Sequence, residues 1–419
     1  MKIELAYGRG HLPIELPEQR TTVIEPSYNP GLSDEPGSVL HALDNPIGSP
    51  ALKDWIKSGS RVCIVFTDIT RATPNDRLIP WLLKYLSAAQ PHQITLINGL
   101  GTHRPNTRVE LEKLLTAEVV NAYRVLNHEP ENPKALVAFG TTRDGTPALL
   151  NRHVVEADVR IITGFIEPHF FAGFSGGPKG IMPGVAGLDT VMSNHGTRNI
   201  ADPNSTFGVT EGNPIWEEMR EIALRPGPSF LLNVALNERR EITGVFAGDL
   251  LEAHRAGCEF VRNSAMQPVK APFDLVVTTN SGYPLDLNLY QSVKGMSAGA
   301  RILKPGGTLI MACECSDGVP NGSSFDRLLR TASNPEEVLS RLASGSVQPD
   351  QWQAQIQALL QRKARILLHS SLSDDQVRAA HLVPCSDIQS TVTQLLSEKV
   401  NGTRIGVLPQ GPLTIPYLI

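Results

Sequence analysis

The densest group of residues able to do chemistry lies between positions 167 and 195. This stretch, EPHFFAGFSGGPKGIMPGVAGLDTVMSNH, contains His169, Lys179 and His195 among several glycines and prolines. Glycine lets a backbone approach a ligand closely and adopt positive φ angles. A lysine in so tight a loop is costly to desolvate unless it is neutral, paired or covalently used. We therefore predict that this loop holds a cofactor and presents its lysine and histidines to it.

The glycines that precede the lysine do not form a known nucleotide motif. Gly176 and Gly177 stand in GFSGGPKG, which lacks both the GxxxxGK[ST] spacing of a phosphate loop and the GxGxxG of a dinucleotide fold. Taken alone, the glycines could form either a structural turn or a loop that holds a ligand. The neighbouring lysine and histidines favour the ligand-binding loop. The missing GxGxxG also disfavours a nicotinamide-dependent oxidoreductase.

Three predicted strands end in polar residues. RVCIVFTD and HQITLINGL are apolar runs typical of buried parallel strands; the first leads to Asp68 and Arg71, the second to His103. VRIITGF leads in the same way to His169. Because ligands bind beyond the carboxyl ends of strands in open α/β sheets, these residues should converge on one site.

Histidines and charged residues at such a site suggest acid–base chemistry on an anion. Two histidines could serve as acid and base on opposite faces of a substrate, and a third could bind a metal. No HExxH, CxxC or paired-carboxylate pattern supplies a conventional zinc site, so a metal would take most of its ligands from outside the protein. Arg71 could bind an anionic group with Asp68 orienting it, or the two could form a local ion pair.

Three residues further along the chain are candidates for the same site. Gln291 and Lys294 are three apart in a predicted helix and share one face, which is either solvated or turned toward a substrate carboxylate. Trp352 lies in a glutamine-rich predicted helix, where simple packing is the more common role for tryptophan.

Composition limits the classes of function. The net charge of −4, without a run of Lys or Arg, disfavours binding to nucleic acid. No apolar run is long enough to cross a membrane, and the N-terminal residues do not form a signal peptide. Five cysteines are too few for a disulfide framework in a chain of 419 residues, so we expect a cytoplasmic protein.

The order of strands and helices predicts an α/β protein with two domains. We expect two α/β domains with parallel-rich sheets and the active site in the cleft between them. Residues 1–270 should form an N-terminal cofactor-binding domain, with residues 404–419 as a candidate for return to it. Residues 271–403 should form a C-terminal domain that contributes substrate and cofactor residues.

Several motifs together resemble one known family. FTDITR, GLGTHR, EPHFFAGFSGGPKGIMPG, SNH, YQSVKGM, QW and VLPQGP, in this order, are similar to motifs of the lactate racemase family that uses the nickel-pincer nucleotide. The resemblance runs along nearly the whole chain, and its His…GGPKG…His segment is specific to that family.

The resemblance implies a cofactor and a role for each central residue. The cofactor would be Ni(II) pyridinium-3,5-bisthiocarboxylic acid mononucleotide, loaded with the help of cofactor-biosynthesis proteins. Lys179 matches its covalent attachment point, His195 matches the nickel ligand, and His103 and His169 match the acid–base pair.

The remaining candidates match supporting positions in the same family. Arg71, Gln291 and Lys294 match residues around the substrate. The cofactor would also contact Asp68, Arg71 and Trp352, and it would occupy the space that Gly176 and Gly177 leave open.

The implied activity is that of an isomerase, a racemase of 2-hydroxy acids. Hydride would leave C2 for the pyridinium carbon, give a 2-keto acid, and return to its other face while the two histidines exchange protons with the substrate. Lactate is the default substrate, and the alternative is racemisation or epimerisation of a larger malate-like, aromatic or sugar acid. A non-catalytic cofactor-binding homologue is the alternative of another class.

Overall fold

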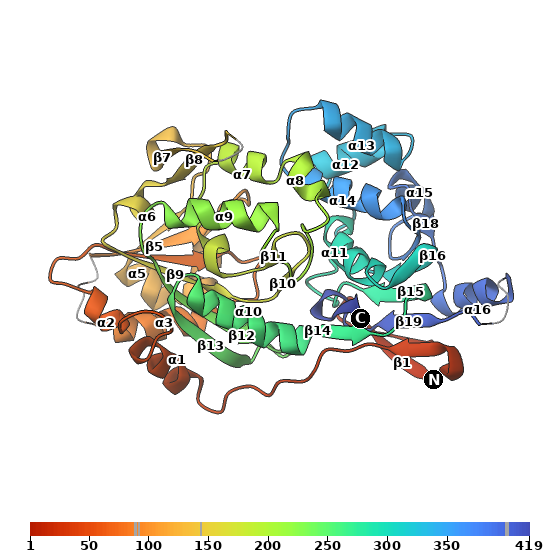
Figure 1. Cartoon of the computed structure of the whole chain (residues 1–419), viewed down its shortest axis with the longest axis horizontal. Helices are drawn as coiled ribbons and strands as arrows, with labels where there is room; N and C mark the ends of the chain where they lie inside the picture. The colour runs from red at the N-terminus through yellow and green to blue at the C-terminus, as the bar shows by residue number, and fades with distance from the viewer. Residues whose placement is uncertain (88–89, 91–92, 143–144, 399–401) are drawn as a thin grey trace. The chain divides into compact units, whose positions relative to one another are not determined.

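The computed structural model describes residues 1–87, 90, 93–142, 145–398 and 402–419. The chain forms two compact units, each built around a six-stranded sheet with helices beside it (Figure 1). The first unit consists of residues 28–195 and 204–262, and the second of residues 1–27, 196–203 and 263–419. The prediction of two α/β units with parallel-rich sheets is confirmed.

The sheet of the first unit has the spatial order β13-β12-β9-β4-β5-β6. Its strands are β4 (Val62–Thr67), β5 (Ile94–Gly99), β6 (Arg124–Asn127), β9 (Val159–Phe165), β12 (Phe230–Leu236) and β13 (Ile242–Asp249). All neighbours are parallel except β12 and β13. The chain builds β5 and β6 on one side of β4 and then β9 and β12 on the other. The direction of winding therefore reverses between β4 and β9, and such a switch point leaves room for a ligand at the carboxyl ends of the strands.

Helices and two small hairpins complete this unit. They are α1 (Glu35–Asp44), α2 (Leu52–Trp55), α3 (Asn75–Tyr85), α4 (Arg108–Leu115), α5 (Ala117–Ala122), the 3-10 turn η3 (Pro133–Ala135), the hairpin β7 (Leu136–Thr141) and β8 (Pro147–Asn151), α6 (Arg152–Glu156), the hairpin β10 (Pro168–His169) and β11 (Gly173–Phe174), the 3-10 turn η4 (Gly177–Gly180), α7 (Leu188–Asn194), α9 (Pro214–Leu224) and α10 (Glu252–Ala265).

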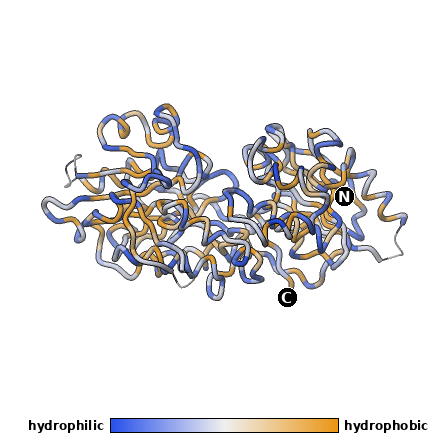
Figure 2. The backbone as a smooth tube through the Cα atoms, turned by 90° about the horizontal axis from the view of Figure 1, so that it is seen from above, coloured by the Kyte–Doolittle hydropathy of each residue, from blue (hydrophilic) through white to orange (hydrophobic). Residues whose placement is uncertain are grey.

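Alternation along the strands divides the two faces of this sheet. Val62, Ile64 and Phe66 of β4 belong to one apolar core with side chains of α1, α3, α4 and α5. In Figure 2 the orange, hydrophobic stretches of the backbone tube gather toward the interior, and many of the outer turns are blue. The glycine-rich turn η4 contacts β4 and β9, and a Cβ atom at Gly180 would collide with the Ile162 side chain of β9. The backbone of η4 therefore lies directly on the sheet.

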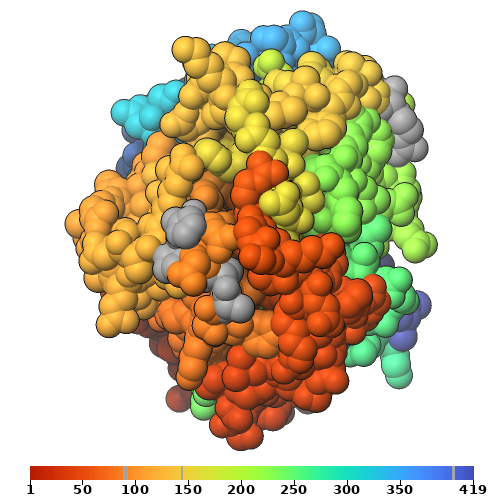
Figure 3. Space-filling model, turned by 90° about the vertical axis from the view of Figure 1, so that its left-hand side faces the viewer, coloured from red at the N-terminus to blue at the C-terminus, as the bar shows by residue number. Residues whose placement is uncertain are grey.

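The segment that precedes β4 packs beside the sheet edge. In Figure 3 its residues, in red-orange, lie next to the green residues of the later part of the unit. The Ile47 N–H donates to the Ala247 carbonyl at 2.8 Å. Gly248 has φ +131°, and a Cβ atom there would collide with the Ile47 backbone, so glycine permits this close approach.

The sheet of the second unit has the order β18-β17-β16-β15-β19-β3, and all its neighbours are parallel. The elements of this unit are β1 (Lys2–Tyr7), β2 (Gly10–Glu15), η1 (Glu18–Arg20), β3 (Thr21–Val23), α8 (Thr197–Ala201), β14 (Met266–Val269), β15 (Phe273–Thr279), α11 (Leu289–Ala300), β16 (Leu303–Ala312), α12 (Ser324–Thr331), α13 (Pro335–Ser344), α14 (Gln351–Gln361), β17 (Arg365–His369), α15 (Asp374–Ala379), β18 (Val383–Pro384), α16 (Ile388–Glu398), β19 (Ile405–Leu408), η5 (Gly411–Leu413) and β20 (Ile415–Leu418).

The ends of the chain divide differently from the boundaries expected from sequence. Residues 1–27, expected in the N-terminal domain, belong to the second unit because β3 pairs with β19. Residues 404–419 also stay in the second unit, where β20 pairs with β14. Strand pairing between distant segments decides both cases, and composition does not reveal it. Among the described residues, no helix has the length and apolar character needed to cross a membrane.

Candidate functional site

A pocket opens at the carboxyl ends of β4 and β9, at the switch point of the first sheet. It is lined by Val65, Phe66, Thr67, Arg71, Gly99, Leu100, Gly101, Ile162, Thr163, Gly164, Phe165, Glu167, His169, Ser175, Gly176, Gly177, Lys179, Gly180, Pro183, Gly184 and Asn233. Five residues predicted from sequence are among them, and they come from two strand-end loops and from η4. The strand-end rule thus brought these five residues to one pocket, whereas Asp68 and His103 are not among its lining residues.

The glycines before Lys179 are required by packing. Gly176 and Gly177 have φ +77° and +53°, which favours glycine at both positions. A Cβ atom at Gly176 would collide with the side-chain oxygen of Asn233, and one at Gly177 would collide with the ring of His254. Both glycines also line the pocket. The backbone there is therefore close to the side chains of Asn233 and His254 and also to the space that a ligand could fill.

Asp68 and His103, from the ends of two adjacent strands, form a hydrogen-bonded pair. The Nδ1 atom of His103 lies 3.0 Å from Oδ2 of Asp68, whereas Nε of Arg71 is 4.0 Å from the same oxygen. Burial alone would raise the pKa of Asp68. The hydrogen bond from His103 and the charge of Arg71 lower the pKa by more than burial raises it, so the pKa lies well below the usual range. The carboxylate only accepts, so Nδ1 of His103 must donate.

The local ion pair between Asp68 and Arg71, one of the two alternatives considered from sequence, is present at 4.0 Å. Asp68 also has a partner that the sequence does not indicate. The shorter contact is with His103, 35 positions away. In a neutral His103 ring this hydrogen bond leaves the lone pair on Nε2, as a general base requires.

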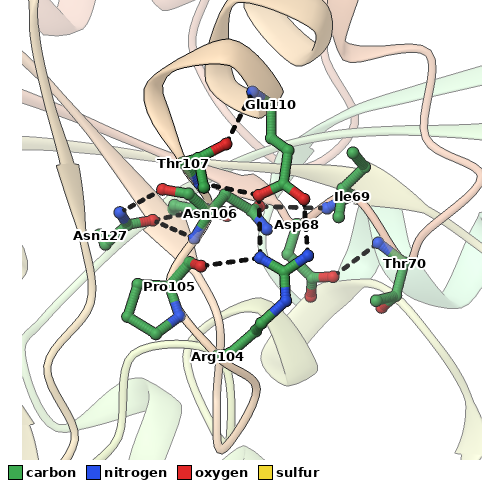
Figure 4. Close-up of polar contacts among 10 residues, drawn as sticks. Asp68, Ile69, Thr70, Arg104, Pro105, Asn106, Thr107, Glu110 and Asn127 are labelled. Atoms are coloured by element: carbon green, nitrogen blue, oxygen red, sulfur yellow. Dashed lines mark hydrogen bonds and ion pairs between the residues drawn. The ribbon is translucent and has the colours of Figure 1, made fainter.

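A frame of asparagines holds the loops of Asp68 and His103 together (Figure 4). The Asn106 side-chain oxygen accepts from the Ile69 N–H at 3.3 Å and from Nδ2 of Asn98 at 2.9 Å. The Asn127 amide accepts from the Asn106 N–H at 3.2 Å and donates to the Asn106 carbonyl at 2.9 Å. Asn98 is fully buried, so these bonds form in a region where an unpaired polar group would be costly.

Charged residues fix the outer side of the same loop. Arg104 holds Glu110 through two nitrogens, at 2.6 and 2.9 Å. Thr107 and Glu110 form a capping box at the start of α4, also drawn in Figure 4. The loop is in turn joined to the lysine segment, because the Gly101 N–H donates to the Gly184 carbonyl at 2.9 Å.

His169 has the opposite proton arrangement. It ends β10 of a tight hairpin, where it pairs with Gly173. The Ala172 N–H donates to Nδ1 of His169 at 3.2 Å, so this nitrogen is an acceptor and the proton of a neutral ring lies on Nε2. In their neutral forms, His103 and His169 therefore carry the ring proton on opposite nitrogens.

Aromatic rings connect His169 to His195. The Phe171 ring makes edge contacts with His169, at a centroid distance of 4.5 Å, and with His195, at 5.0 Å. Phe170 also contacts His169 at 5.0 Å. Phe170 and Phe171 are buried, so they shield this part of the site from water.

His195 is a buried histidine at the end of α7. Its Nδ1 lies 3.0 Å from the Asn194 side-chain oxygen, and the Asn194 amide group donates to Glu218 at 2.7 Å and to the Ile215 carbonyl at 3.1 Å. This chain makes Nδ1 the donor and leaves the ring lone pair on Nε2. Burial, with a smaller effect of the charge on Lys179, lowers the pKa of His195 to about 3. A neutral ring oriented by its second nitrogen is the form of histidine that binds metals.

The remaining predicted residues belong to the second unit. Gln291 and Lys294 lie half-buried on one face of α11, as their spacing predicted, and Trp352 is buried in α14. Their roles toward a substrate or cofactor stay predictions. Among the described residues no group of three or more His, Cys, Asp or Glu is placed to hold a metal ion.

Sequence reasoning missed several residues that support the site. Asn233 interrupts the apolar run of β12, and this polar residue in a buried strand was a usable signal. His254 in α10 and the asparagines of the His103 loop gave no such signal, because their partners are distant in sequence.

Comparison with known proteins identifies the family. Residues 7–208 match the family model of the lactate racemase N-terminal domain, and residues 269–415 match that of the lactate racemase C-terminal domain. A lactate racemase of Thermoanaerobacterium thermosaccharolyticum is 36% identical over 98% of this chain and 97% of its own length. A lactate racemase of Lactiplantibacillus plantarum is 34% identical over 92% of this chain and 91% of its own.

Solved structures agree at the level of the fold. The structure of the lactate racemase apoprotein from Thermoanaerobacterium thermosaccharolyticum superposes with a TM-score of 0.93 at 34% identity, covering 99% of this chain and all of that one. A Thermotoga maritima protein shares the fold alone, with a TM-score of 0.69 at 20% identity, covering 94% of this chain and all of that one.

Replacement of the buried Asp68 carboxylate should make the free energy of unfolding less dependent on pH in the acidic range. Because the pKa of Asp68 is lower in the folded protein than its ordinary value of 3.8, ionised Asp68 stabilises the fold above about pH 4, and this is lost as the pH falls. We expect Asp68→Asn to lower the free energy of unfolding at pH 7 by about 1–3 kcal/mol, and by less at pH 3, as measured by urea denaturation. The exposed Asp54→Asn should change it by less than about 0.5 kcal/mol at both values. An equal loss at pH 7 and pH 3 for Asp68→Asn would contradict this role.

Proposed function

Since this chain belongs to the lactate racemase family, we propose that it racemises lactate or a close 2-hydroxy acid with a nickel-pincer nucleotide attached to Lys179. Its enzyme class, a racemase among the isomerases, follows from the family. The substrate, the cofactor and the residue roles are the proposal. The observation that carries it is the opposite proton arrangement of His169, which lines the pocket together with Lys179, and of His103, which follows the pocket-lining Leu100 and Gly101 on the loop after β5.

Racemisation needs a proton carrier for each enantiomer. Nε2 of His103, held by Asp68, is arranged to take the proton from the hydroxyl of a 2-hydroxy acid. His169 would give a proton from Nε2 to the carbonyl oxygen of the 2-keto acid formed between the two half-reactions. It would do so as the doubly protonated ring, with its Nδ1 contact to the Ala172 N–H released, because a neutral ring that lost its only N–H proton would be left as an imidazolate. The roles exchange in the reverse direction, because each turnover leaves the first histidine protonated and the second deprotonated.

The residues around the pocket fit the cofactor. His195 offers one neutral, oriented ring nitrogen, which suits a metal whose other ligands come with the cofactor. The amine of Lys179 would form the covalent link, and the backbone at Gly176 and Gly177 leaves space along the pocket wall. When bound, the nucleotide would supply the hydride acceptor and donor for C2 of the substrate.

Cationic side chains would hold the substrate carboxylate. Arg71 lines the pocket, and its guanidinium can bind a carboxylate through two nitrogens. We assign Gln291 and Lys294 to the same carboxylate and its neighbouring oxygen, and Trp352 to packing against the cofactor. These side chains would hold the carboxylate so that C2 and its hydroxyl are oriented toward the cofactor and the two histidines.

The substrate is tested with enantiopure acids. Protein produced together with the cofactor-synthesis machinery should convert either pure enantiomer of lactate into the racemate, followed by chiral chromatography, while protein made without it should not. Malate, an aromatic 2-hydroxy acid and a sugar acid should react more slowly. Preference for one of these would replace lactate as the substrate, and loaded protein that racemises none of them would identify a non-catalytic homologue.

Covalent attachment is tested by mass. Lys179→Ala should remove the cofactor adduct from the intact mass of the co-produced protein, because the amine that forms the link is gone. Lys53→Ala, at an exposed position of the same unit, should keep the adduct. An adduct of full occupancy on the Lys179 variant would refute the tether.

The two proton carriers are tested separately from attachment. His103→Gln and His169→Gln should each retain the mass adduct and lower kcat by about 10²–10⁴, the range for loss of a general acid or base. The exposed His41→Gln should leave kcat unchanged. If either site variant retained full kcat, that histidine would have no part in proton transfer.

A further inference from the structure

Two buried histidines outside the proposed chemistry hydrogen-bond to the segment that carries Lys179. His254 lies on α10, and His128 follows β6. Each is only 1% exposed, and each places Nε2 2.9 Å from a backbone carbonyl of this segment. The carbonyls belong to Ser175 and Ala186, which lie on the two sides of the lysine.

His254 fixes the start of the segment. Its Nε2 lies beside the Ser175 carbonyl, which only accepts, so this nitrogen donates. The ring lies against the α-carbon of Gly177, where a Cβ atom would collide with it. The Cys258 sulfur, one turn along the helix, lies 3.4 Å from Nε2 and 3.7 Å from Nδ1. Burial lowers the pKa of His254 to about 4, partly offset by the bond to Ser175, so the ring is neutral near pH 7.

His128 fixes the end of the segment in the same way. Asn151 donates its side-chain amide to Nδ1 of His128 at 3.1 Å, so Nε2 carries the proton and donates to the Ala186 carbonyl. Burial also lowers the pKa of His128, so this ring is neutral too. The Asn151 N–H donates to the Val185 carbonyl at 2.9 Å, which adds a second bond at this end.

Asn233 holds the middle of the turn. Its side-chain oxygen accepts from the Gly177 N–H at 2.8 Å, and its amide donates to the Leu232 carbonyl at 3.1 Å. It is fully buried and lines the pocket. The turn that bears Lys179 is thus bonded to β12 as well as to the two histidines.

We infer that His254 and His128 are positioning residues that anchor residues 175–186 at both ends and thereby set the place of Lys179. Gly176 and Gly177, in the turn before the lysine, have no side chain to pack against the protein, and glycine allows many backbone conformations. Hydrogen bonds from rigid, buried donors supply the restraint. The link to cofactor attachment rests on the function proposed above, whereas the anchoring itself does not.

The anchoring can be measured on protein without cofactor. His254→Leu and His128→Leu remove the donor and keep an apolar side chain of similar bulk, and His254→Gln and His128→Gln keep an N–H group able to donate. Amide hydrogen exchange followed by mass spectrometry should show peptides within residues 175–186 exchanging about ten- to a hundredfold faster in each Leu variant, as expected when a buried carbonyl loses its donor. The Gln variants should restore most of the protection.

A control separates anchoring from general loss of stability. Leu83→Ala in the core of α3 should lower the midpoint of unfolding without a selective change in residues 175–186. Unchanged exchange in both Leu variants, or the same selective increase in Leu83→Ala, would overturn the inference. Failure of the Gln variants to restore protection would do so as well, since bulk rather than the hydrogen bond would then matter.

The same variants report on attachment. Co-produced with the cofactor-synthesis machinery, the Leu variants should carry a smaller fraction of the mass adduct than the Gln variants and the unmodified protein. A full adduct on the Leu variants, despite faster exchange, would overturn the role in placing Lys179. No adduct on the unmodified protein would refute the proposed cofactor and leave the exchange result intact.

Discussion

Close backbone packing at the switch point of the first sheet is the constraint on which the site depends. The lysine turn lies on β4 and β9 with almost no side chains between them, and Gly180 meets Ile162 where a Cβ atom would not fit. The Gly101 N–H reaches the Gly184 carbonyl for the same reason. A larger residue at Gly180 would push the lysine turn away from β9.

Hydrogen bonds determine which nitrogen of each histidine carries the proton. Asp68 accepts from Nδ1 of His103, and Ala172 donates to Nδ1 of His169, so the neutral forms of two chemically identical side chains carry their proton on opposite nitrogens. In His195 a third partner, Asn194, makes Nδ1 the donor in a buried, neutral ring. The neighbouring residue therefore determines which ring nitrogen is left with a lone pair, and so which of the proposed roles each histidine could fill.

Much of this arrangement was predictable from sequence, because it follows from local patterns. Apolar runs located β4, β5 and β9, and the strand-end rule placed Arg71 and His169 at one pocket. The pairing of Asp68 with His103 was not predicted, since it depends on two strands lying side by side in the right register. Likewise β3 joins the second sheet through a partner near the end of the chain, which no local pattern shows.

The distribution of residues between the units suggests a division of labour. The proposed tether, nickel ligand and both proton carriers all lie in the first unit, within the segment matched by the N-terminal family model. These roles require fixed geometry, and the first unit supplies it through buried hydrogen bonds to backbone atoms. Gln291 and Lys294, whose proposed partner is the substrate carboxylate, lie on one helix of the second unit. A charge acts over a longer distance than a hydrogen bond and depends less on direction, so this proposed role requires less exact positioning than proton transfer does.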